Sequence, residues 1–134
     1  YSGIDTHITD WSSNSLELIL SGKKIGTYIS PSTKKIPSRK LWIGFGMVST
    51  GTLTVDTGAE EALIRKNASL LYKGINHFSE KIDKGDCITI FNTEGNPIAK
   101  GISDWNSKDI DEALQTNNSK NSIPVIHKDN MIIL

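Results

Sequence analysis

The chain reads LTVDTGAEEAL from residue 53 to residue 63, ASLLYKGI from 68 to 75, KGDCITI from 84 to 90 and IAKG from 98 to 101. The first stretch predicts a strand that leads into a helix, because apolar Leu53–Val55 is followed by Thr57 and, three residues later, by Glu60. That spacing is typical of a capping box at a helix start. The helix would carry acids in its first turn and bases in its last, which complements the helix dipole. These charges are Glu60, Glu61, Arg65 and Lys66. They therefore have a structural explanation before any functional one.

The segments that follow predict a small domain built mainly from strands. Ile88–Phe91 and Ile98–Ile102 alternate around the turn-forming residues 92–97, which predicts a hairpin. Ser107 is placed to cap a short polar helix that runs to Leu114. The polar stretch 115–122 reads as a loop, and two apolar runs after it predict closing strands. These runs are Val125-Ile126 and Met131–Leu134.

Residues 1–29 predict a strand, a helix and a second strand. The helix would begin at Asn14, which has Glu17 three residues on, and end at Gly22. Its apolar face would consist of Leu16, Ile19 and Leu20. Two strands are too few to bury such a face. We therefore interpret this segment as a β-α-β piece of a larger α/β domain, with its helix covered by a neighbouring chain or by the domain that follows.

The charge is balanced overall but uneven along the chain. Fifteen Lys and Arg residues match fifteen Asp and Glu residues, so no global field attracts nucleic acid or a membrane. No acid occurs between Glu17 and Asp56, whereas six bases do: Lys23, Lys24, Lys34, Lys35, Arg39 and Lys40. The Pro- and Ser-rich part of this run, residues 30–41, predicts a basic linker. A solvated linker and an anion-binding face both remain possible explanations of the bases.

No catalytic, cofactor-binding or metal-binding residue is predicted. The three histidines are 70 and 50 residues apart, and the single cysteine, Cys87, lies in an apolar run that predicts inert packing in the core. No Gly-x-Ser-x-Gly nucleophile motif occurs. A lone cysteine fits a reducing cytosol, and no stretch is long and apolar enough for a membrane span. Because the chain begins at Tyr1, we expect a fragment of a longer protein.

The stretches quoted at the outset resemble the PUA domain, a compact β-barrel. Other segments are similar to the C-terminal third of the bacterial glutamate 5-kinase family: GIDT at 3–6, GT at 26–27, SRKLWI at 38–43, DWNS at 104–107 and PVIHKDNM at 124–131. The resemblance covers essentially the whole chain. It implies an α+β fold with three parts: a β-α-β remnant of an amino-acid-kinase domain at 1–29, a basic linker at 30–41, and a PUA-like mixed β-barrel with short helices at 42–134.

The resemblance also implies a function for the parent protein. The parent would transfer phosphate from ATP to the side-chain carboxylate of glutamate, the first step of proline biosynthesis. Its ATP and Mg²⁺ would be held by the kinase domain. This chain would then carry no catalytic residue and would be inactive alone. The expected partners are the rest of the kinase chain and further copies of it, in the cytoplasm and without a membrane.

Three hypotheses remain for the barrel itself. The first is RNA binding, which the resemblance implies because RNA-modifying relatives contact RNA around the matching helix and turn. The residues expected to form this surface are Gly58, Ala59, Arg65, Lys66, Lys73 and Gly74. The basic side chains would contact phosphates, and the glycines would permit close approach of the backbone. The second is a regulatory or assembly module of the kinase, which exposed aromatic residues among Trp11, Trp42 and Trp105 would support. The third is the RNA-binding tail of an RNA-modifying enzyme such as a pseudouridine synthase, which fits the barrel but not residues 1–43 or 124–131.

Overall fold

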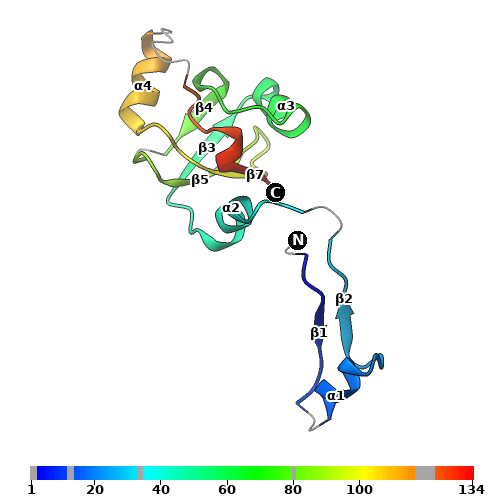
Figure 1. Ribbon diagram of the computed structural model, residues 1–134. Coiled ribbons are helices and arrows are strands. Elements are labelled where there is room, and N and C mark those ends of the chain that lie inside the picture. The colour runs from blue at the N-terminus through cyan, green and yellow to red at the C-terminus, as the bar shows by residue number, and fades with distance from the viewer. Residues whose placement is uncertain (1–2, 12–13, 33–34, 80, 117–122) are drawn as a thin grey trace. The chain divides into compact units, whose positions relative to one another are not determined.

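The computed structural model describes residues 3–11, 14–32, 35–79, 81–116 and 123–134, and the chain divides into two compact units (Figure 1). Unit 1 is Tyr1–Ser38 and unit 2 is Arg39–Leu134. The division falls inside the stretch expected to be a linker. Its last residues, Arg39 to Leu41, belong to a short helix, α2 (Ser38–Leu41), and lie in unit 2.

Unit 1 contains strand β1 (Thr6–Ile8), helix α1 (Ser15–Leu20) and strand β2 (Thr27–Ile29). The predicted order of strand, helix and strand is confirmed. β1 and β2 pair directly as antiparallel neighbours, with Thr6 opposite Ile29. With six residues, α1 is only about 9 Å long. The chain turns back at Gly22 and Gly26, which both have positive φ. A side chain on Gly26 would collide with the Ile8 carbonyl oxygen.

The predicted capping box of α1 is not formed, since the Asn14 side chain makes no capping hydrogen bond. The apolar face of this helix is largely uncovered. Leu16 and Leu20 are 69% and 79% exposed. Unit 1 therefore does not bury the face by itself, and its burial against a neighbouring chain or against unit 2 stays a prediction.

Unit 2 is built on one mixed five-stranded sheet in the order β4-β3-β5-β6-β7. The strands are β3 (Gly51–Val55), β4 (Ile75–Phe78), β5 (Cys87–Phe91), β6 (Pro97–Ile102) and β7 (Met131–Ile133). β3 and β5 run parallel, and the other neighbouring pairs are antiparallel. The hairpin predicted around residues 92–97 is confirmed as β5–β6.

The sheet is open, so the expected barrel is not closed by a full ladder of hydrogen bonds. β4 and β7 are its edges, and they have only four and three residues. The described segments that precede them meet instead at an antiparallel bridge between Leu70 and Ile126. The Leu70 N–H donates to the Ile126 carbonyl oxygen at 2.9 Å, and the Leu70 carbonyl oxygen accepts from the N–H groups of Val125 at 2.8 Å and Ile126 at 3.3 Å. This bridge links the two segments without pairing the edge strands.

Two helices lie on opposite sides of unit 2, α3 (Thr57–Lys66) and α4 (Ser107–Thr116) (Figure 1). The N-cap of α3 is Asp56 and not Thr57, because the Asp56 carboxylate accepts the Ala59 N–H at 2.6 Å. α4 is capped by Asn106, whose side chain accepts the Asp109 N–H at 2.9 Å. The predicted cap, Ser107, instead accepts the Ile82 N–H at 2.6 Å.

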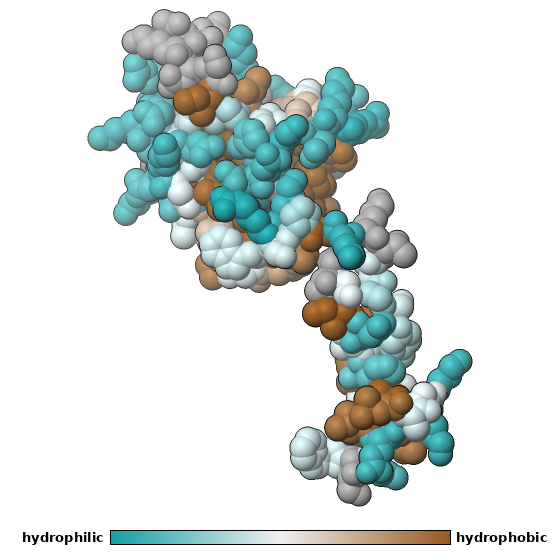
Figure 2. Space-filling model, viewed as in Figure 1, coloured by the Kyte–Doolittle hydropathy of each residue, from teal (hydrophilic) through white to brown (hydrophobic). Residues whose placement is uncertain are grey.

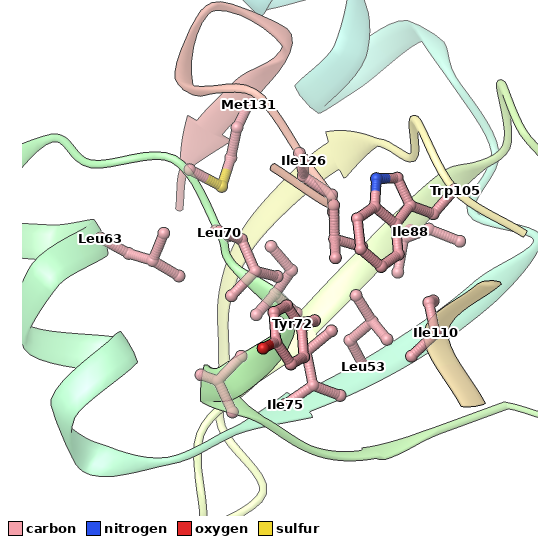
Figure 3. Packing of buried hydrophobic residues seen from close by; sticks show 14 of the residues in the cluster. Leu53, Leu63, Leu70, Tyr72, Ile75, Ile88, Trp105, Ile110, Ile126 and Met131 are labelled. Atoms are coloured by element: carbon pink, nitrogen blue, oxygen red, sulfur yellow. The ribbon is translucent and has the colours of Figure 1, made fainter. Parts of the chain in front are cut away.

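The core of unit 2 lies between the sheet and these helices (Figure 3). Its labelled members are Leu53, Leu63, Leu70, Tyr72, Ile75, Ile88, Trp105, Ile110, Ile126 and Met131. The rings of Tyr72 and Trp105 stack with centroids 6.2 Å apart. Of the three tryptophans, Trp105 is therefore a core residue, whereas Trp11 is fully exposed and Trp42 is 54% exposed.

A π-helical segment, η1 (Trp42–Gly46), continues α2 and packs against β6 and β7. Ile43 anchors it in the interior, and Lys100 of β6 donates from Nζ to the Met47 carbonyl oxygen at 2.5 Å. Cys87 is buried as expected, and burial raises the pKa of its thiol, with Lys100 partly offsetting the rise. Among the described residues, no helix combines the length and apolar character needed to cross a bilayer.

Candidate nucleic-acid interface

A groove of about 320 Å³ lies between α3 and the chain that follows it, and we call it the α3 groove. Its lining residues are Asp56, Gly58, Ala59, Ala62, Leu63, Ala68, Ser69, Leu70, Leu71, Lys73 and Gly74. Most of these side chains are small or apolar. The groove therefore offers a shallow apolar floor, with one cation and one carboxylate at its rim.

The structure brings four of the six predicted RNA-binding residues together in this groove. Gly58 and Ala59 come from the first turn of α3, whereas Lys73 and Gly74 come from the 3₁₀ turn η2 (Tyr72–Gly74) just before β4. The two segments are held together because the Asp56 N–H donates to the Gly74 carbonyl oxygen at 3.0 Å. Sequence reasoning missed Asp56, although an Asp directly before a helix is a strong capping signal.

Arg65 and Lys66 do not line the α3 groove. They lie in the last turn of α3, and Arg65 is paired with Glu61 at 3.7 Å on the exposed side of the helix. A pair this exposed contributes little to stability. Of the four predicted charges on α3, Glu60 also has a structural partner, since its carboxylate accepts from Asn92 Nδ2 at 3.1 Å. Asn92 is buried and in turn orders the β5–β6 turn by accepting the N–H of Asn96 at 2.9 Å.

The two glycines of the groove are required to different degrees. A Cβ at Gly74 would overlap the Cβ of Ala59, so glycine is needed there for α3 to approach η2. At Gly58, the nearest atom to a Cβ would be Asp56 Oδ1 at 3.4 Å, an ordinary contact. The fold therefore demands glycine at position 74 but not at position 58.

Lys73 is the one predicted cation that lines the groove, and it lies beside an aromatic ring. Its Nζ is 6.0 Å from the ring centroid of Tyr72, at the limit of a cation–π contact. Tyr72 is buried, and its hydroxyl points away from Trp105 without a hydrogen-bond partner among the described residues (Figure 3). Of the two leucines before it, Leu70 is buried in the core and Leu71 is half exposed at the groove.

The structure offers no metal centre in its described residues. No group of three or more His, Cys, Asp or Glu side chains comes together there. Within the described part of unit 2, the α3 groove is the best candidate for a functional surface.

Residues 51–123, more than half of the chain, match the PUA domain family. The chain belongs to this family. A PUA domain protein from Thermoplasma acidophilum has a similar structure, with a TM-score of 0.50 and 18% identity, over 98% of this chain and 92% of that one. At that identity the likeness shows the fold alone. The PUA match begins at the first residue of β3 and includes the whole α3 groove.

Curated relatives extend the similarity to unit 1. The chain is 32% identical to the glutamate 5-kinase of Syntrophotalea carbinolica over 98% of its own length and 38% of that protein. It is 35% identical to the glutamate 5-kinase of Caldanaerobacter subterraneus subsp. tengcongensis over 90% of its own length and 35% of that protein. This PUA-containing chain therefore spans just over a third of the length of the relatives that it matches.

Proposed function

We propose that the chain is the C-terminal part of an ATP-dependent glutamate 5-kinase, the enzyme of the first step of proline biosynthesis. The observation that carries the proposal is the similarity to glutamate 5-kinases over 98% of the chain, which includes the segment before the PUA match. A PUA tail of an RNA-modifying enzyme would not account for that first segment. ATP, Mg²⁺ and glutamate would be bound by the remainder of the cytoplasmic, homo-oligomeric kinase.

A chimaera tests the kinase proposal. The S. carbinolica enzyme would be shortened by the part that aligns with this chain, and this chain would be attached in its place. We expect the shortened enzyme to be inactive, because it lacks the strands and helix equivalent to unit 1. The chimaera is expected to regain at least about tenfold over that background in glutamate-dependent ADP release, which corresponds to about 1.4 kcal/mol in barrier height.

A second chimaera that carries Gly26→Val is the matched control. The valine side chain would collide with the Ile8 carbonyl and disturb the β1–β2 pairing. It is expected to remain close to the background rate. A chimaera that assembles like the natural enzyme and yet shows no glutamate-dependent activity would contradict the proposal.

We further propose that the PUA domain binds RNA through the α3 groove. Support comes from the glycine at position 58, which the fold does not require, and from Lys73 at the rim. A glycine allows a ligand to approach the backbone closely, and a lysine can contact a phosphate. The second candidate is a regulatory or assembly module of the kinase. It is favoured by the Asp56 carboxylate that lines the groove, because a negative charge repels RNA phosphates.

Fluorescence anisotropy with a structured RNA, at low and at physiological salt, separates the two candidates. RNA binding in the groove predicts an affinity that falls with salt, and Lys73→Glu is expected to weaken binding and to reduce the salt slope by about one. Lys66→Glu is the matched control, since it makes the same charge change on α3 outside the groove. Flat titrations at both salts, or an equal loss in both variants, would leave the regulatory module as the function of the domain.

A further inference from the structure

We infer that Arg39, Lys40 and Trp42 form a second RNA contact in unit 2, a platform on which one unpaired base stacks while the two cations hold its phosphates. This inference rests on the proposed RNA-binding role and adds a surface that is distinct from the α3 groove. None of the three residues lines that groove. We call these three residues, with Gly46, the Trp42 platform.

The Trp42 ring is about half exposed and also rests against the main chain. It lies over the backbone of Gly46, where an added Cβ would be 2.9 Å from Trp42 Cδ1 and 3.4 Å from Nε1. Glycine at position 46 therefore leaves room for the ring to rest on the main chain. Because this contact restricts the ring before binding, the side chain loses less conformational entropy when a base stacks on it.

The segment under the ring is anchored at two further points. Ile43, the next residue, is completely buried. Lys100 donates from Nζ to two carbonyl oxygens of this segment, at 2.5 Å to Met47 and 3.5 Å to Gly44. Because β6 holds the segment through Lys100, the exposed tryptophan belongs to a rigid part of the domain. Apolar side chains reach the surface of unit 2 elsewhere as well (Figure 2), so exposure alone does not distinguish this site.

The positive charge of the segment that carries the ring distinguishes this site from the other exposed apolar side chains. Arg39 and Lys40 precede Trp42 in the continuous α2–η1 segment, and no acid occurs in the sequence between Glu17 and Asp56. Among the described residues, no carboxylate lies within ion-pair distance of either cation. Arg39 is oriented by a hydrogen bond from Nε to Asn130 Oδ1 at 2.9 Å, which does not use its two terminal amino groups. The α3 groove, in contrast, is lined by the Asp56 carboxylate.

An exposed aromatic ring that follows, in one continuous segment, two cations without carboxylate partners in the described part of the chain has the chemistry of a binding site for single-stranded nucleic acid. Bases of any sequence stack on aromatic rings, and neighbouring cations track the phosphates, so little sequence preference is expected. Arg39 also offers a planar group that can bind a phosphate through two hydrogen bonds. This charge complementarity favours RNA over an apolar protein surface as the occupant of the platform.

The test uses the full chain and a labelled single-stranded oligouridine, which has no stable secondary structure. Trp42→Ala is expected to weaken binding about tenfold by anisotropy, and Trp42→Phe to restore most of it, because phenylalanine keeps a stacking face. Trp11→Ala is the matched control, since Trp11 is the other exposed tryptophan. In a Trp11→Phe background, oligouridine is expected to quench the fluorescence of Trp42, while Trp105 is shielded in the core.

The outcomes separate the platform from the groove. Loss of oligouridine binding in Trp42→Ala but not in Lys73→Glu supports the platform, even if structured RNA does not bind the groove. Equal binding by wild type and Trp42→Ala overturns the inference, and so does binding without fluorescence quenching. A Trp42→Ala variant that keeps its RNA affinity but loses self-association in sedimentation also overturns it, because the ring then contacts protein. Gly46→Ala supplies a further check, because the added methyl group would displace the Trp42 ring. It is expected to weaken oligouridine binding. The fold should stay intact, so the buried Cys87 should still react slowly with a thiol reagent.

Discussion

Gly74→Val is expected to lower the free energy of unfolding of unit 2 by about 3 kcal/mol, because it forces extra volume into a closely packed contact. The added Cβ would overlap that of Ala59 in α3. The backbone at this position cannot easily withdraw, since the Gly74 carbonyl oxygen accepts the Asp56 N–H at 3.0 Å. The substitution should therefore push α3 away from η2 and loosen the α3 groove.

Gly58→Ala is the matched control for this prediction. Position 58 has room for a methyl group, and alanine is favoured over glycine in a helix by up to about 1 kcal/mol. Urea denaturation, followed by tryptophan fluorescence, should give a clearly lower midpoint for Gly74→Val and an unchanged or higher midpoint for Gly58→Ala. Equal midpoints for the two variants would show that the α3–η2 contact is not as tight as the structure has it.

Ile88→Ala is expected to cost about 2–5 kcal/mol, the range for removing a large buried side chain. Ile88 lies in β5, the central strand of the sheet, and is completely buried among residues of the core (Figure 3). A small domain has a total stability of about 5–15 kcal/mol. The change therefore removes a large fraction of what holds unit 2 together.

The neighbouring thiol reports this loss directly. Cys87 is buried beside Ile88, and burial raises its pKa, so it should react slowly with a thiol reagent until the sheet opens. In Ile88→Ala the sheet should open more often, so the labelling rate of Cys87 should rise in proportion to the increase in the unfolding equilibrium constant. Val48→Ala, at a residue that is 83% exposed, should label at the wild-type rate. Labelling of Ile88→Ala at that same rate would be inconsistent with a core centred on β5.

The order of the elements could be predicted from the sequence because it depends on local signals. The alternation of Ile88–Phe91 and Ile98–Ile102 around a polar turn sufficed for the β5–β6 hairpin, which the structure confirms. The first turn of α3 and the η2 turn, which carry Gly58 and Lys73, are linked in the sequence by the resemblance to PUA domains and not by a local pattern. The sequence predicts Thr57 and Ser107 as the caps of α3 and α4, whereas the structure has Asp56 and Asn106, one residue earlier in each case. The two adjacent residues are both good capping residues, so the sequence alone does not choose between them.

From the sequence by itself, short-range patterns of apolar, turn and capping residues predicted the β5–β6 hairpin and the two helices of unit 2. The PUA fold and the candidate groove followed from the resemblance of its motifs to the PUA family. Only the tertiary structure decided how the remaining strands pair and which charges meet. It joined β1 to β2, left β4 and β7 as open edges, and separated Arg65 from Lys73. It also showed that glycine is obligatory at position 74 and optional at position 58. These features depend on contacts between residues far apart in the chain, and no local pattern specifies the partner of such a contact.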